Sequence, residues 1–146
     1  MRLSEHFTLA EMTRSQMATR HGIDNTPNDM QLENLKTLAK GMELVRTKLD
    51  SLPIIISSGF RCEALNDLLG SKRTSAHIRG LAADFTCDRY AHVARVFDVL
   101  ATSSIPFNQL ILEYDSWIHI AFPLEDEEPR RQTLVIDSEG ARIYNP

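Results

Sequence analysis

The chain has 146 residues, of which 42% are hydrophobic and 25% are charged, and its formal net charge is −4. This length and composition are typical of one soluble globular domain with a core of its own. No long basic run occurs, which argues against a nucleic-acid partner. No segment has the roughly 18 consecutive apolar residues of a membrane span. The first six residues contain no apolar signal-peptide core, so we expect synthesis in the cytoplasm.

The first third of the chain predicts helices. Thr8 and Glu11 have the spacing of a capping box, which begins a short helix. A second short helix is expected over 15–21, ending at Gly22. Thr26 is then the predicted N-cap of a long helix, with a proline in its first turn. The apolar residues of this helix recur at three- and four-residue steps and predict a buried stripe: Leu35, Leu38, Ala39, Met42, Val45 and Leu49.

Strands dominate the rest of the chain. Three consecutive isoleucines predict a buried strand over 53–57, and a short helix follows over 62–69. Further strands are expected over 81–87, 110–114, 117–122, 133–136 and 141–143, with an amphipathic helix over 90–101. The sequence therefore predicts a single α+β domain over 1–146, with N-terminal helices packed on a small, mainly antiparallel sheet.

Two histidines and one aspartate predict a metal site on this sheet. Asp84 lies on an expected strand, and Gly80 lets the chain turn so that His77 faces the same point. His119 lies centrally on a later strand, and Trp117, two residues earlier, points to the same face. Two imidazoles and one carboxylate are the ligands of a catalytic zinc site with a position open for water. A hydrogen-bonded histidine with a capping aspartate is the alternative, and spacing alone leaves both open.

One cysteine lies close to these residues and resembles a further ligand. Cys87 follows Asp84 by three positions. Odd spacing along a strand puts two side chains on opposite faces. We therefore expect Cys87 to be a buried free thiol rather than a metal ligand.

The residues around the histidines resemble a known family. The run Ser57-Ser58-Gly59-Phe60-Arg61, the pattern Ser75-x-His77-x-x-Gly80-x-Ala82-x-Asp84 and Trp117-x-His119 are similar to the M15 family of zinc peptidases. This family includes D-Ala-D-Ala carboxypeptidases and phage endolysins that cut peptidoglycan stem peptides. The resemblance is strongest to short phage and prophage members and extends from Leu3 to about Phe122.

The resemblance implies roles for individual residues. His77, Asp84 and His119 would bind one zinc ion, and Arg61 would lie in the active site, where a guanidinium can hold a carboxylate or an oxyanion. Ser75 would hydrogen-bond locally or contact substrate. Trp117 is a further candidate for the substrate cleft, although aromatic residues on a hairpin more often pack against a helix.

The general base is harder to assign. Many relatives have an acidic residue three positions before the last histidine, where this chain has Ser116. Glu113 and Asp115 are the available acids. A three-residue turn would pair Glu113 with Trp117 and put it on the face of His119, whereas a two-residue turn would favour Asp115. We predict Glu113 as the catalytic base.

The resemblance implies a zinc-dependent hydrolase that cleaves an amide bond in peptidoglycan stem peptides, either as a D,D-carboxypeptidase or as an L-Ala–D-Glu endopeptidase. We expect a monomer whose partner is the wall peptide, with neither nucleic acid nor a membrane as a partner. As an endolysin it would act on the cell wall after release from the cytoplasm. The alternative is a non-catalytic zinc-binding module of a phage structural or assembly protein, which the missing acid at Ser116 suggests.

Overall fold

The computed structural model describes residues 1–146 and contains six helices and six strands. The helices are α1 (Leu9–Thr13), α2 (Gln16–Arg20), α3 (Asp29–Lys48), α4 (Glu63–Leu68), α5 (Ala76–Arg79) and α6 (Val93–Ala101). The strands are β1 (Ile55–Ser58), β2 (Ala82–Thr86), β3 (Gln109–Glu113), β4 (Trp117–Ala121), β5 (Gln132–Asp137) and β6 (Gly140–Ile143). None of the helices has the length and apolar character needed to cross a membrane.

The predicted caps begin the first two helices. Thr8 and Glu11 form the capping box of α1, and the Ser15 hydroxyl accepts a hydrogen bond from the third residue of α2. The prediction of Thr26 as the cap of α3 was wrong by two residues. Asn28 caps this helix, because the Thr26 hydroxyl instead donates a hydrogen bond to Asp24 at 2.6 Å.

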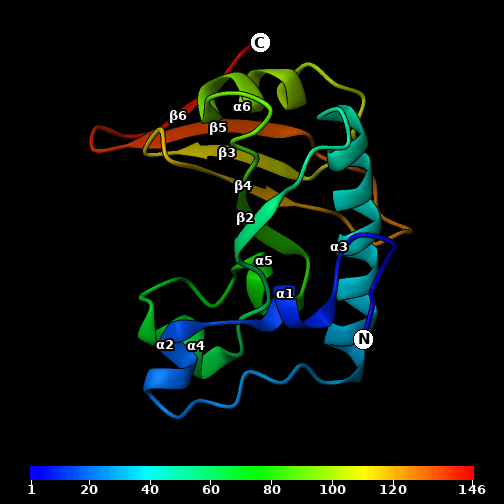
Figure 1. Ribbon diagram of the computed structural model, residues 1–146. Helices are drawn as coiled ribbons and strands as arrows, with labels where there is room; N and C mark the ends of the chain where they lie inside the picture. Colours follow the sequence, from blue (N-terminus) through cyan, green and yellow to red (C-terminus); the bar gives the residue numbers. More distant parts are fainter.

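All six strands form one sheet in the order β1-β2-β4-β3-β5-β6. Every neighbouring pair is antiparallel except β3 and β5, which are parallel. The mainly antiparallel α+β architecture predicted from the sequence is therefore confirmed. Figure 1 shows α3 along one side of the sheet and α6 above it, with the short helices α1, α2 and α4 gathered at the other end.

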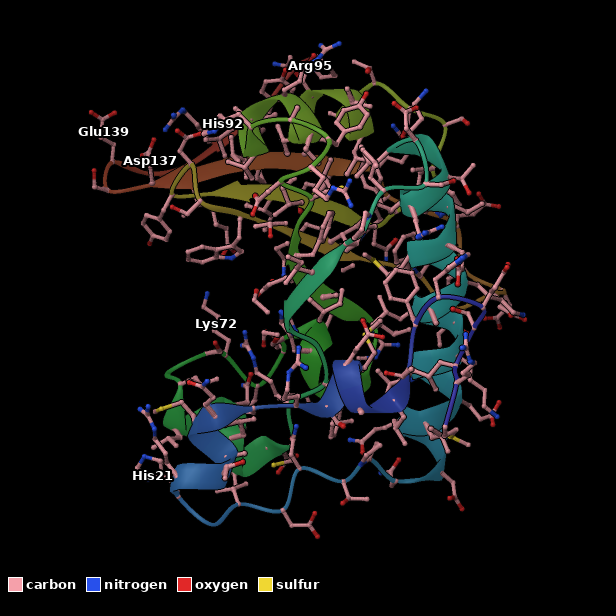
Figure 2. All side chains as sticks on the ribbon, in the orientation of Figure 1. His21, Lys72, His92, Arg95, Asp137 and Glu139 are labelled. Atoms are coloured by element: carbon pink, nitrogen blue, oxygen red, sulfur yellow. The ribbon has the colours of Figure 1, made fainter.

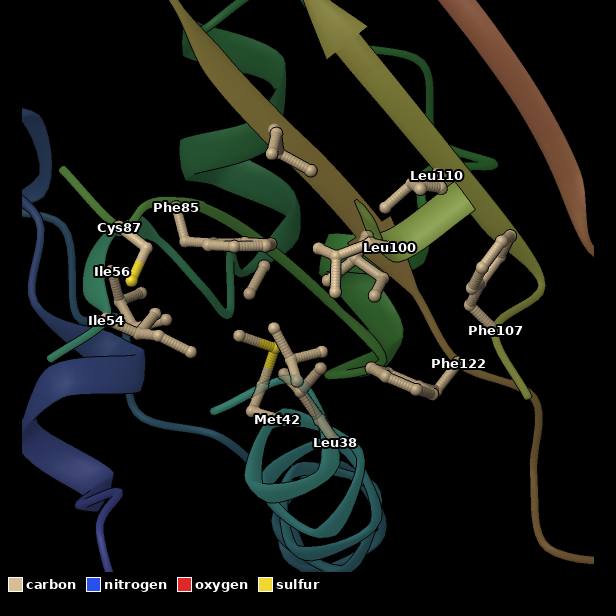
Figure 3. Close-up of a cluster of buried hydrophobic side chains, with 14 of the residues drawn as sticks. Leu38, Met42, Ile54, Ile56, Phe85, Cys87, Leu100, Phe107, Leu110 and Phe122 are labelled. Atoms are coloured by element: carbon tan, nitrogen blue, oxygen red, sulfur yellow. The ribbon is translucent and has the colours of Figure 1, made fainter. Parts of the chain in front are cut away.

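One face of the sheet is the core face. The stripe of α3 is completely buried against it, from Leu35 to Leu49, as predicted. Figure 3 shows Leu38 and Met42 of this helix pointing toward Phe85, Leu100 and Phe122. The strands contribute every second residue to this core, which includes Ala83, Phe85, Leu110, Leu112, Ile118 and Ile120. Cys87 lies in the same core with a free thiol, as the spacing predicted.

The close approach of α3 to the sheet requires a glycine. A Cβ atom at Gly41 would lie 2.5 Å from the ring of Phe122, so a larger residue would push the helix away. Phe122 directly follows β4 and is 5% exposed. This contact fixes the distance between α3 and the strand that contains His119.

Alternation along the strands puts the polar residues on the opposite face. Asp84 on β2, Glu113 on β3, and Trp117 and His119 on β4 all lie between residues of the core face. No core helix covers this set, since α3 and α6 pack on the other side. The sheet therefore separates an apolar core from a polar face that contains the predicted site.

Apart from the cap of α3, three elements differ from the sequence expectation by more than one residue at an end. The short helix α5 was not predicted, although Ser75 and Gly80 are its caps. Helix α6 begins at Val93, three residues later than expected. Strand β1 is shifted toward Ser58 and forms the edge of the sheet. Strand alternation buries Ile54 and Ile56 in the core and points Ile55 to the opposite face, where it is 56% exposed.

Candidate metal centre

His77 is positioned by a single helical turn with defined ends. The Ser75 hydroxyl accepts a hydrogen bond from the His77 backbone N–H at 3.2 Å, which begins α5. Gly80 ends the turn in the left-handed conformation, with φ of 76°. A Cβ there would lie 2.8 Å from a backbone oxygen of Gln31. The chain can thus reverse tightly against α3 and enter β2, which brings His77 beside Asp84.

Asp84 and His119 meet because their strands are neighbours. They are directly opposed residues in the antiparallel pair β2–β4. His119 Nδ1 lies 3.0 Å from Asp84 Oδ1, and His77 Nε2 lies 3.2 Å from the same oxygen. One possible ligand atom from each of the three residues lies within 4.8 Å of the others, and all three residues are buried.

The hydrogen bonds of His77 show that this group fits a cation. His77 Nδ1 lies 2.6 Å from the backbone oxygen of Gly59, which can only accept, so Nδ1 carries the proton. In the neutral ring, Nε2 then presents a lone pair to the carboxylate oxygen of Asp84. Burial lowers the pKa of His77 and disfavours the imidazolium, although the neighbouring Asp84 opposes this effect. A divalent metal ion would remove the repulsion between the two acceptors.

The carboxylate of this group is ionised. Burial alone would raise the pKa of Asp84, but the neighbouring imidazoles, the hydrogen bond from the His119 ring first among them, outweigh burial and lower the pKa. Two neutral imidazoles and one carboxylate are the donor set of three-ligand catalytic zinc sites. The backbone oxygen of Gly59 orients the His77 ring in the way that outer hydrogen bonds orient metal-binding histidines.

Arg61 lies against the same aspartate. Its Nη2 is 3.4 Å from Asp84 Oδ2, the oxygen that faces away from the imidazoles. Its Nε and Nη1 donate to the hydroxyls of Ser58 and Ser71, both at 3.1 Å. The Arg61 side chain is only 12% exposed, and its guanidinium is held at three points. Two of its five N–H groups remain available for a substrate oxygen.

The register of the β3–β4 hairpin separates the two candidate bases. Glu113 pairs with Trp117, and the turn between them has three residues. Glu113 therefore shares the face of Asp84 and His119. Burial raises the pKa of Glu113, and repulsion from Asp84 adds to the effect. Asp115 lies in the turn, is 67% exposed, and has His92 Nε2 at 3.3 Å. The structure brings Glu113 to the metal-ligand group and leaves Asp115 outside it.

The two predicted substrate contacts lie at different places. Ser75 lines a cavity of about 410 Å³ together with His119. Trp117 packs on Tyr114, with ring centroids 5.8 Å apart, rather than on a helix. Its indole Nε1 is buried without a hydrogen-bond partner. A second cavity of about 470 Å³ is lined by Ser58 and Arg61.

Three residues that support the site were part of the sequence pattern but were given no individual role. Ser58 and Ser71 hold Arg61, and the buried Asn66 donates to the backbone oxygens of Ser71 and Lys72 at 3.2 and 3.0 Å. Ser58 and Asn66 lie within or just after the run that carries the family resemblance. Their partners are distant in sequence or in a loop, so only the fold shows what they contact.

A comparison with known proteins identifies the family. No curated protein shows significant similarity to the chain. The family model described as Peptidase M15 matches residues 5–121, which include all three residues of the metal-ligand group together with Arg61 and Glu113. The matched region extends from the segment before α1 to the end of β4. The chain therefore belongs to the peptidase M15 family.

Proposed function

We propose that this protein is a zinc-dependent peptidase that hydrolyses an amide bond in bacterial peptidoglycan stem peptides. The observation that carries the proposal is the pair of acceptors formed by His77 Nε2 and Asp84 Oδ1, 3.2 Å apart, with His119 Nδ1 beside them. A cation between these atoms satisfies all three. Membership of a peptidase family supplies the reaction class, and a peptide is the substrate.

The residues around the metal-ligand group would divide the reaction between them. A zinc ion bound there would polarise the scissile carbonyl and lower the pKa of its coordinated water toward about 7. Glu113 would accept a proton from the attacking water and return it to the leaving amine. Its half-buried position and raised pKa suit a group that both takes and gives a proton.

Arg61 has the chemistry to hold the substrate. Its guanidinium is held by Ser58, Ser71 and Asp84, so the orientation of its two free N–H groups is fixed. A fixed donor pair can bind a substrate carboxylate or the oxyanion that forms during attack. Ser75 would line the adjoining cleft beside His119. Trp117 lies outside that cleft, opposite Glu113 on the hairpin, and would contact the substrate there.

We further propose that the whole chain acts as one domain in the lysis of a bacterial host by a phage or prophage, after release from the cytoplasm. The similarity of the motifs to short phage members supports this role. The hairpin β5–β6 lies beyond the family match but pairs with β3 in the same sheet, which supports a single unit.

Digestion of purified peptidoglycan tests the function. The zinc-loaded protein should release new amino groups, and mass spectrometry of the muropeptides should identify the cut bond. Free D-Ala would indicate a carboxypeptidase, and a new N-terminal D-Glu an endopeptidase. The same protein stripped of metal is the control. Bound zinc without cleavage of any wall preparation would favour the alternative, a non-catalytic binding module, which Ser116 in place of the usual acid also suggests.

A further inference from the structure

The cavity beside His119 has an unusual charge. Its 13 lining residues include Lys72, Arg79 and Arg130 but no aspartate or glutamate. The chain as a whole has 20 acidic and 16 basic residues, so an excess of basic residues in the whole protein does not explain why this cavity is lined by cations alone. A cleft lined by one sign of charge concentrates ligands of the opposite sign. This cleft adjoins the metal-ligand group through His119 itself.

The charged ends of these three side chains have no protein partners. None of them lies within 4.0 Å of a carboxylate or donates a hydrogen bond from its side chain, whereas Arg61, Arg73, Arg95 and Arg142 all pair with acids. Figure 2 shows Lys72 extending from the loop between α4 and α5 toward the level of the sheet. The three cations are therefore free to bind an anion without breaking an existing ion pair.

The backbones of the same three residues are nevertheless anchored. Each forms a hydrogen bond with the side chain of an asparagine from another part of the chain. These bonds are Asn66 Nδ2 to Lys72 O at 3.0 Å, Asn34 Nδ2 to Arg79 O at 2.9 Å, and Arg130 N to Asn108 Oδ1 at 3.1 Å. Anchoring of the backbone lowers the entropy lost when the side chains bind a ligand. The backbone of each cationic residue is thus held in place, while its charged group has no partner.

We propose that Lys72, Arg79 and Arg130 form a subsite that binds a free carboxylate of the substrate peptide next to the scissile bond. This inference rests on the proposed function and narrows its substrate class to acidic peptides. Stem peptides meet this requirement at D-Glu, whose α-carboxylate is free when the chain continues through its γ-carboxyl. Arg and Lys bind carboxylates through charge-assisted hydrogen bonds. Arg61 is separate from this set because it is already paired with Asp84.

A matched pair of peptides tests the subsite without catalysis. The zinc-loaded Glu113→Gln variant, which should keep the ion and lose most of the activity, is titrated calorimetrically with L-Ala–γ-D-Glu–L-Lys and with the same tripeptide as its D-Glu α-amide. The acid should bind about tenfold more tightly, which is the effect of one charge-assisted contact. This preference should shrink as the salt concentration rises, because the cations are exposed. Equal affinity for the two peptides, or no binding of either, would overturn the subsite.

Charge-removing variants locate the preference. Lys72→Gln, Arg79→Gln and Arg130→Gln should each reduce the ratio of the two affinities, and the triple variant should abolish it. Arg89→Gln is the matched control, since Arg89 is also exposed and without a partner acid but lies outside the cleft. A full preference in the triple variant would contradict the proposal. Since all three side chains are exposed, the single variants should fold normally.

Hydrolysis by the zinc-loaded protein separates this inference from the proposed function. If both tripeptides are cleaved with equal kcat/KM and bind equally, the subsite is wrong and the peptidase function stands. If the acid binds preferentially but neither the tripeptides nor any wall preparation is cleaved, the subsite stands and the peptidase function is wrong. Cleavage with a preference for the acid that is lost in the triple variant supports both.

Discussion

His77 Nε2 lies 3.2 Å from a carboxylate oxygen of Asp84, while Nδ1 donates to the backbone oxygen of Gly59 at 2.6 Å, so in the neutral ring Nε2 and the carboxylate oxygen are both acceptors. Two acceptors at this distance repel each other in a buried site. A cation bound between the two atoms attracts both of them, so the repulsion is replaced by attraction. The folded protein is therefore less stable without metal. Binding of metal should raise the free energy of unfolding as well as the activity.

Zinc should raise the melting temperature. At a free zinc concentration 100 times the dissociation constant, binding stabilises the folded state by about 2.7 kcal/mol. For a chain of this size that corresponds to a rise of about 5–10 °C, measured by calorimetry with zinc and with a chelator. His77→Ala should lose both the rise and the bound zinc. His92→Ala is the control, because His92 is exposed and contacts only Asp115. An unchanged zinc content in His77→Ala would count against the site.

Glu113→Gln should remove most of the peptidase activity and leave zinc binding intact. The amide keeps the shape of the side chain but cannot accept a proton, and general acid–base catalysis contributes about 10²–10⁴-fold. Asp115→Asn, the same change two residues away, should keep its activity because Asp115 is exposed and faces His92. The measurement is kcat for amino-group release. A fully active Glu113→Gln, or an inactive Asp115→Asn, would move the base from one acid to the other.

Glu43 should make the attachment of the N-terminal segment depend on pH. Its carboxylate accepts hydrogen bonds from the Ser4 hydroxyl at 2.6 Å and from the backbone and ring of His6, both at 2.7 Å. Burial opposes ionisation, but these hydrogen bonds outweigh it and lower the pKa of Glu43. A lowered pKa stabilises the fold above the pKa of the unfolded chain, about 4.3, and this stabilisation is lost as the pH falls through the folded value.

Glu43→Gln tests this attachment by denaturant unfolding at several pH values. At pH 7 the variant should be less stable by about 1.5–3 kcal/mol, the contribution of a hydrogen bond to a charged group. The difference in unfolding free energy between the variant and the natural chain should decrease as the pH falls below about 4.3, because the carboxyl group of the natural chain then becomes neutral too. Glu33→Gln, on the same helix but 69% exposed, should differ little at any pH. A Glu43→Gln difference that stays constant down to pH 2 would contradict the prediction.

Arg131 should be important for stability although it lies outside the family match. Its guanidinium donates to the backbone oxygens of Ala101, Ser103 and Ile105, and stacks on Phe107 with 4.3 Å to the ring centroid. It thereby satisfies carbonyls at the end of α6 and beyond it. Arg131→Ala should lower the free energy of unfolding by about 2–3 kcal/mol, from lost hydrogen bonds and the cation–π contact.

The neighbouring arginine provides the control for this effect. Arg130→Ala should change the free energy of unfolding little, because the Arg130 side chain is exposed and has no partner. Arg131→Lys should lie between the two, since lysine keeps the charge but not the planar fork. Equal stability of Arg131→Ala and Arg130→Ala in urea unfolding would exclude the capping role.

Local patterns in the sequence were enough for much of the fold. The capping box at Thr8, the apolar stripe from Leu35 to Leu49 and Gly22 at the end of α2 depend on neighbours within four residues. The same is true of the alternation that puts Asp84 and Cys87 on opposite faces of the sheet. These features are encoded locally, because helix and strand periods act on adjacent residues.

Other features depended on contacts that the sequence does not display. Asn28 replaced Thr26 as a cap because Asp24 competes for the threonine hydroxyl. The parallel pairing of β5 with β3 joins strands that are separated in the chain by β4 and a loop, so no turn motif predicts the pairing. Ile55 is exposed because the face of β1 opposite the core has nothing packed on this side chain, which a run of three isoleucines alone does not predict.

The candidate site divides in the same way. The sequence by itself determined that His77 and Asp84 are joined by a tight glycine turn and that His119 lies on a later strand. Only the tertiary structure decided that Asp84 and His119 oppose each other, that Glu113 rather than Asp115 shares their face, and that three unpaired cations line the adjoining cleft. Strand register and loop packing depend on many weak long-range contacts. A shift of one residue in the register moves each side chain of a strand to the other face of the sheet, and no local pattern specifies the register.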